Sequence, residues 1–110
     1  MVKRKRTYVP IRTFETVKKF DDFVQDEKLW MYDRIYKSIK KAIESGNDIA
    51  HVAKIKIEDV NATILVDSDK IEWLYILNIV LNGYESEEMY EKCIQVRDLI
   101  ELIKKNNLNL

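Results

Sequence analysis

Residues 69–105 read DKIEWLYILNIVLNGYESEEMYEKCIQVRDLIELIKK, and this stretch decides the fold. Apolar residues recur every three or four positions on both sides of a polar interruption at residues 85–88, a spacing that is typical of helices. Asp69 with Glu72 has the spacing of a capping box for the first helix, with Asp in place of Ser or Thr, and Ser86 is a candidate N-cap for the second. The stretch therefore predicts an antiparallel helical hairpin.

The first helix of this hairpin is apolar on two faces, one that contains Leu77 and one that contains Trp73. A helix of this kind is buried twice, by its own domain and by another chain. In the second helix Cys93 lies on the main apolar stripe, whereas Ile94 and Leu99 lie beside it and are expected on the outer side. We therefore predict a partner-binding surface formed by Trp73, Val80, Tyr90, Ile94, Leu99 and Leu102.

Two more helices are predicted before the hairpin, over about residues 14–24 and 27–45. Thr13 and Asp26 are their candidate N-caps, because side-chain oxygens at these positions can accept a hydrogen bond from a free backbone N–H. Gly46 tolerates the left-handed conformation that often ends a helix, so we expect the second helix to end there.

After residue 50 the spacing changes from helical to alternating. The first set is His51, Ala53, Ile55 and Ile57, and it alternates with Val52, Lys54 and Lys56. Residues 59–61 supply a turn and residues 62–66 are rich in β-forming side chains, which predicts a two-stranded antiparallel hairpin. The expected fold class is therefore α+β and mainly α, with four helices and one small antiparallel β-hairpin.

The predicted organisation is a basic N-terminal arm at residues 1–12, a single α+β domain at residues 13–105 and a tail at residues 106–110. Basic side chains of the arm could contact phosphates. The candidate nucleic-acid-binding residues are Lys3, Arg4, Lys5, Arg6 and Arg12. Few aromatic side chains lie near them and the net charge of the chain is zero, so nucleic acid is the alternative partner and a protein is the first.

The charges are unevenly distributed along the neutral chain. Residues 1–56 hold 14 Lys and Arg against 8 Asp and Glu, whereas residues 57–110 hold 5 against 11. One interpretation is a basic half that folds against an acidic half. The other is an electrostatic contact between copies or with a partner.

Few groups are available for chemistry. His51 is the single histidine and Cys93 the single cysteine, so a His- or Cys-based metal site, a nucleophile–base pair and an internal disulfide all lack partners. We therefore expect no enzyme, no catalytic or metal-binding residue and no cofactor. No apolar run is long enough for a membrane and no signal peptide is recognisable, so the expected location is the cytoplasm of a bacterium or of an infected host cell.

Residues 90–100 read YEKCIQVRDLI and resemble the second helix of the UVR motif. That motif is a helical hairpin of bacterial excision-repair proteins and of some protease adaptors. It has an aromatic residue before Glu-Lys, two small residues, then Leu-Arg-Asp and an apolar residue two positions further on. The positions that fit are Tyr90, Glu91, Lys92, Val96, Arg97, Asp98 and Ile100, and those that depart are Ile94, Leu99 and Leu102. The resemblance implies a pairing hairpin and no repair activity.

The wider layout also resembles small proteins of tailed bacteriophages, in which a Trp-Leu helix precedes a Tyr-Glu-x-Cys helix and a Leu-Ile pair. Here these are Trp73-Leu74, residues 90–93 and Leu99-Ile100. The resemblance implies a phage-encoded protein that binds a host protein or fills a structural place in a particle, with the virion as a second location. We therefore predict a non-enzymatic protein–protein interaction module that forms homo-oligomers.

Overall fold

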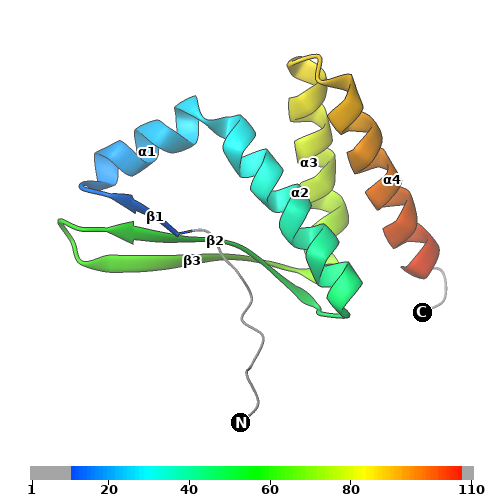
Figure 1. Ribbon diagram of the computed structural model, residues 1–110, viewed down its shortest axis with the longest axis horizontal. Helices are drawn as coiled ribbons and strands as arrows, with labels where there is room; N and C mark the ends of the chain where they lie inside the picture. The colour runs from blue at the N-terminus through cyan, green and yellow to red at the C-terminus, as the bar shows by residue number, and fades with distance from the viewer. Residues whose placement is uncertain (1–10, 108–110) are drawn as a thin grey trace, which may run out of the picture.

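The computed structural model describes residues 11–107, and more of them are helical than extended. In chain order the elements are strand β1 (Ile11–Phe14), helices α1 (Val17–Asp26) and α2 (Lys28–Ser45), strands β2 (Ile49–Ile57) and β3 (Ala62–Asp69), the short 3-10 helix η1 (Lys70–Glu72), and helices α3 (Trp73–Ser86) and α4 (Tyr90–Asn107). The predicted fold class is confirmed: it is α+β and mainly α, with four helices and a C-terminal antiparallel helical hairpin (Figure 1).

The sheet has three strands in the order β1-β2-β3, one more than the sequence predicted. Strands β2 and β3 form the predicted antiparallel hairpin, whereas β1 runs parallel to β2, with Ile11 opposite Lys54 and Phe14 opposite Ile57. Ile11 and Arg12, which were expected in the arm, therefore belong to the sheet. A four-residue parallel strand is too short to show an alternation of its own, and its pairing depends on residues far away in sequence.

The first two helices begin later than predicted. Because residues 11–14 are extended, Thr16 rather than Thr13 caps α1, and its hydroxyl accepts a hydrogen bond at 3.1 Å from the backbone N–H three residues further on. Asp26 is the last residue of α1 and does not cap α2. The N-cap of α2 is Glu27, which makes no capping hydrogen bond through its side chain.

The other helix ends agree with the sequence in part. Gly46 ends α2 as predicted, with a φ of 73°. Asp69 caps η1 through a hydrogen bond that its carboxylate accepts from the Ile71 N–H at 3.3 Å. Ser86 is the last residue of α3 and not the cap of α4, which begins after a turn in which Glu88 has a φ of 57°.

A β-bulge in β2 changes which side chains face the helices. The register shifts between His51, which lies opposite Asp67, and Ala53, which lies opposite Val66, so that Val52 is an extra residue. Val52 and Ala53 are consecutive and both buried, whereas His51 is exposed beside Asp67. The sequence prediction placed His51 on the same side as Ala53, and it was wrong there because a bulge shifts the alternation by one residue.

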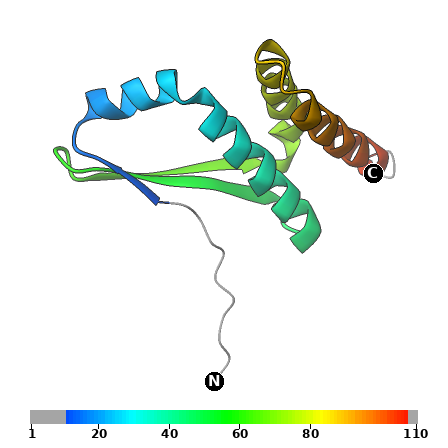
Figure 2. The same cartoon turned by 45° about the horizontal axis from the view of Figure 1, so that its top comes forward.

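Helices α1 and α2 cover one face of the sheet, and α3 and α4 lie side by side on the far side of α2 from α1 (Figures 1 and 2). Two apolar clusters join these layers. The smaller cluster joins β2 to the first two helices and contains Val52, Ala53, Ile55 and Ile57. The larger cluster joins α2, α3 and α4 to the start of β2, and it includes Ile39, Ala50, Leu77, Val80, Cys93 and Val96. The helical hairpin is thus attached to the sheet through α2.

Candidate interaction surfaces

A polar cluster fixes the helical hairpin to α2. The Tyr84 hydroxyl of α3 and the Lys92 ammonium of α4 both donate hydrogen bonds to the Asp33 carboxylate of α2, the second at 2.9 Å. Partial burial by itself raises the pKa of Asp33, but these hydrogen bonds and the charges of Lys92 and Lys37 bring that pKa below its usual range. Burial, and then the contact with Asp33, raise the pKa of Tyr84, so its hydroxyl remains a donor. One carboxylate therefore connects three helices.

Helix α3 also approaches α2 closely at Gly83. A Cβ atom added at Gly83 would lie 2.2 Å from the nearest ring carbon of Tyr32. The Tyr32 ring in turn packs edge-on against Tyr84, with 5.9 Å between the ring centroids. Because Gly83 has no side chain, α3 can pack directly against the Tyr32 ring of α2.

The structure divides the six residues of the predicted partner-binding surface into two groups. Trp73, Val80 and Leu99 lie in the core, with exposed fractions of 3%, 0% and 5%. Leu99 was expected on the outer side, but α4 faces α2 as well as α3, as the contact between Lys92 and Asp33 shows, so its buried arc is wider than one stripe. The exposed members of the set are Tyr90, Ile94 and Leu102.

Three exposed apolar residues on the first half of the hairpin were not in the predicted set. Ile71 and Tyr75 are 88% and 73% exposed, and Ile79 is exposed as well. Tyr75 and Ile79, four residues apart, lie on the same face of α3, and Ile71 lies in η1, which leads into that helix. The same spacing was visible in the sequence, but two other apolar faces of this helix concealed it. We call Ile71, Tyr75 and Ile79, with Ile94 of α4, the outer stripe.

The face of the sheet opposite α1 and α2 is not covered by any element within residues 11–107 (Figure 2). The strand register brings Ile11, Lys54 and Leu65 into one row across this face, and Thr13, Lys56 and Thr63 into the next. Beyond the bulge, His51 Nδ1 lies 3.1 Å from the Asp67 carboxylate on the same face. The uncovered face is therefore mixed, with two lysines and two exposed aliphatic side chains.

Strand β3 is an edge of the sheet. It pairs with β2 on one side, and in the described part of the chain no strand pairs with its other side. Leu65 is 65% exposed and Ile64 is also exposed. In Figure 1 the half of β3 nearest the turn after β2 is open on this side. The backbone N–H and C=O groups along this edge are available to another strand.

The structure describes only one of the five candidate nucleic-acid-binding residues. Lys3, Arg4, Lys5 and Arg6 lie outside the described residues. Arg12 lies on the helix-covered side of β1, with its guanidinium carbon 4.6 Å from the ring centre of Phe23 and 5.3 Å from that of Trp30. Arg12 is thus engaged in cation–π contacts within the fold.

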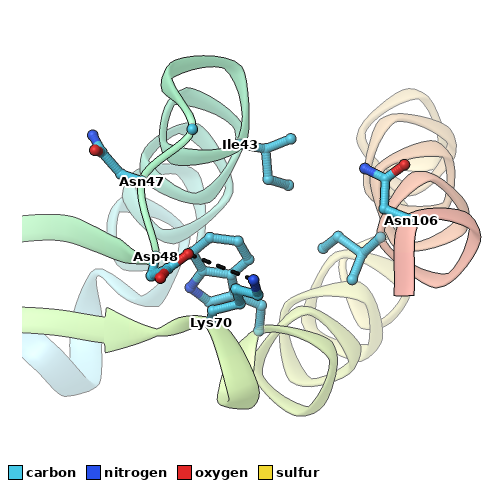
Figure 3. A pocket seen from close by; sticks show the side chains of 8 residues that line it. Ile43, Asn47, Asp48, Lys70 and Asn106 are labelled. Atoms are coloured by element: carbon cyan, nitrogen blue, oxygen red, sulfur yellow. Dashed lines mark ion pairs between the residues drawn. The ribbon is translucent and has the colours of Figure 1, made fainter. Parts of the chain in front are cut away.

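A cavity of about 240 Å³ opens between the end of α2, η1 and the end of α4 (Figure 3). Trp73 and Ile103 contribute apolar surface to it, and Asn106 stands at its rim. Its single ion pair joins Lys70 Nζ and Asp48 Oδ1 at 3.5 Å, and the two side chains are 45% and 76% exposed. An exposed pair of this kind is weak, so the cavity offers little that would orient a small polar ligand.

Within residues 11–107, no group of three or more His, Cys, Asp and Glu side chains is arranged to hold a metal ion. None of the helices described has both the length and the apolar character needed to cross a membrane. Comparisons with known protein families, curated proteins and solved structures give no match to this chain.

Proposed function

We propose that this protein is a non-enzymatic protein–protein interaction module that self-associates. The outer stripe carries the proposed binding of a protein partner. Single exposed apolar residues are common on protein surfaces, but Tyr75 and Ile79 lie one turn apart on α3, Ile71 is exposed in η1 just before that helix, and Ile94 is exposed on α4. Contact with another chain would remove this apolar surface from water, which favours binding.

The attachment of the hairpin supports the same function. Asp33 and the close contact at Gly83 hold α3 and α4 against α2, so the outer stripe is presented on a prearranged surface. A prearranged surface loses less conformational entropy on binding than a mobile one. An apolar line at four-residue spacing suits a partner that packs a helix or a groove against it.

The resemblance to tailed-phage proteins adds a proposed setting. It would make the partner a host protein or another component of a particle, in a bacterial or infected cell or in the virion. This part of the proposal is supported by the sequence alone.

The test is affinity capture from cells that make the protein, combined with sedimentation of the purified chain. Tyr75→Lys and Ile94→Lys should reduce capture of the partner by at least roughly tenfold while the circular dichroism spectrum stays unchanged, because hot-spot contacts are worth about 2 kcal/mol. Gln95→Lys is the matched control, since Gln95 is an exposed neighbour of Ile94 outside the stripe. Leu77→Lys should unfold the protein. A strict monomer that captures no partner would contradict the proposal.

A second candidate function, nucleic-acid binding, is favoured by Lys54 and Lys56 on the uncovered face of the sheet. Lys54 lies opposite Ile11, and the basic segment of residues 3–6 precedes Ile11 in the sequence. Deleting residues 1–6 should then abolish binding of a fluorescent duplex, and affinity should fall steeply with salt. Binding that survives the deletion and is insensitive to salt would exclude this function.

A further inference from the structure

We propose that two copies of the chain pair along the free edge of β3, antiparallel and related by a two-fold axis, to form one continuous sheet of six strands. This inference rests on the self-association in the proposed function and names the surface through which it occurs. The outer stripe of the hairpin is then left free for a different partner.

The first five residues of β3, 62–66, lack the features that usually prevent edge pairing. Residues 60–66 contain no charge, no Pro and no Gly, and the exposed side chains among them include Val60, Ile64 and Leu65. Natural edges are commonly protected by Lys, Pro or a bulge, or are covered by another element. The single bulge in this sheet lies on β2, away from the free edge. Strand β1, at the other edge, is only four residues long.

Two-fold pairing allows few registers, because residues that lie opposite each other must point to the same face of the sheet. The two-fold axis must therefore lie midway between the two copies of one residue, which then pairs with itself. With the axis at Leu65, Leu65 meets Leu65 of the second copy, Ile64 meets Val66, Ala62 meets Ser68 and Thr63 meets Asp67. An axis at Val66 would place Leu65 opposite a carboxylate, and an axis at Asp67 would place two carboxylates together. The register at Leu65 pairs Leu65 with Leu65, Ile64 with Val66 and Thr63 with Asp67, so only the outer pair, Ala62 with Ser68, joins an apolar to a polar residue.

This register also brings opposite charges together on the uncovered face. Lys56 lies opposite Thr63 within one copy, so Asp67 of the second copy would follow in the same row. Two strand spacings separate Lys56 from that aspartate, about 10 Å, which the two side chains can bridge together across the small threonine. Lys56 has no ion-pair partner among the described residues of its own chain. The two-fold axis creates this contact twice.

Disulfide cross-linking tests the register directly. In the proposed dimer Leu65→Cys places two thiols opposite each other, within the range of a disulfide, so mild oxidation should give a covalent dimer. Thr63→Cys is the matched control on the same strand and face, because its two copies would lie about 13 Å apart along the strands. A mixture of Thr63→Cys and Asp67→Cys chains should cross-link as a heterodimer. Cys93 is buried and can be retained, with alkylation before analysis on a gel.

Sedimentation of the full chain tests the surface. Leu65→Lys should raise the dimer dissociation constant by at least roughly tenfold, because like charges would meet at the axis. Tyr75→Lys should leave the dimer intact. A dimer that resists Leu65→Lys and whose Leu65→Cys form does not cross-link would overturn the edge pairing alone. A wild-type chain that stays monomeric at its highest soluble concentration would overturn the proposed self-association as well.

Discussion

Asp33 is the polar residue that links α2 to both helices of the hairpin. It accepts hydrogen bonds from Tyr84 and Lys92 while about a third of its side chain stays in solvent. Its pKa lies below the usual range, so the folded chain takes up this proton at lower pH than the unfolded chain does. The stability that Asp33 contributes is therefore full above the unfolded pKa of 3.8 and is lost as pH falls through the folded pKa.

Asp33→Asn should lower the free energy of unfolding by about 1 kcal/mol at pH 7, a value reduced for solvent screening. The difference from wild type should be smaller at an acid pH below 3.8, because the aspartate becomes protonated and resembles the amide as the pH falls through its folded pKa. Urea denaturation at both pH values measures this difference. Asp98→Asn, at an exposed position of α4, should be close to wild type throughout. A difference that is the same at both pH values would mean that the charge of Asp33 is not responsible.

At the scale of elements, the two glycines are required for different reasons. Gly83 leaves room for the Tyr32 ring, whereas Gly46 has open space around it and a left-handed φ of 73°. Gly83→Ala should lower stability by about 1–2 kcal/mol, because overpacking outweighs the gain in helix propensity. In a Tyr32→Leu background the same change should become neutral or stabilising by up to about 1 kcal/mol. Thermal unfolding of the four variants in this cycle measures the coupling.

Gly46→Ala is the control for that cycle. It should cost about 1 kcal/mol through its backbone conformation, with or without the Tyr32 ring. Equal effects of the Gly83 change in both backgrounds would show that the contact with Tyr32 does not limit the approach of α3 to α2.

The elements also show what local sequence can predict. Helices α2, α3 and α4 and the β2–β3 hairpin were predicted because each repeats a spacing over several residues. Strand β1 and the bulge at Val52 were not, since each depends on a partner strand. Three of the six residues of the predicted surface are exposed, and Ile94 is one of them. Leu99 is buried because α4 meets α2 as well as α3, and sequence spacing does not reveal that second contact.

At the scale of the whole molecule, the described residues 11–107 do little to neutralise the uneven charge within one chain. Among residues 11–107, no ion pair joins a Lys or Arg of the first half to an Asp or Glu of the second. In two ion pairs, Lys92 with Asp33 and Lys70 with Asp48, the lysine belongs to the acidic second half and the aspartate to the basic first half. Only His51 with Asp67 follows the predicted direction. This arrangement favours the second interpretation of the sequence, in which the unpaired charges act between molecules.

Self-association should therefore weaken with salt. Raising the ionic strength from about 0.05 M to 0.5 M shortens the Debye length to a few ångströms and should raise the dimer dissociation constant several-fold. Sedimentation at the two salt concentrations measures this change. Lys56→Gln should remove part of the salt dependence, and Lys18→Gln, on the exposed surface of α1, should not. Association that strengthens with salt would instead indicate a purely apolar contact.

The parallel pairing of β1 with β2 has a consequence for the order of folding. The β2–β3 and α3–α4 hairpins each close a short loop, whereas β1 can join β2 only after the chain through α1 and α2 has returned to it. A loop roughly eight times longer than the turn after β2 costs about 2 kcal/mol more to close. Four residues of pairing return little of that cost, so β1 should be the last strand to dock during folding and the first to detach in the native protein.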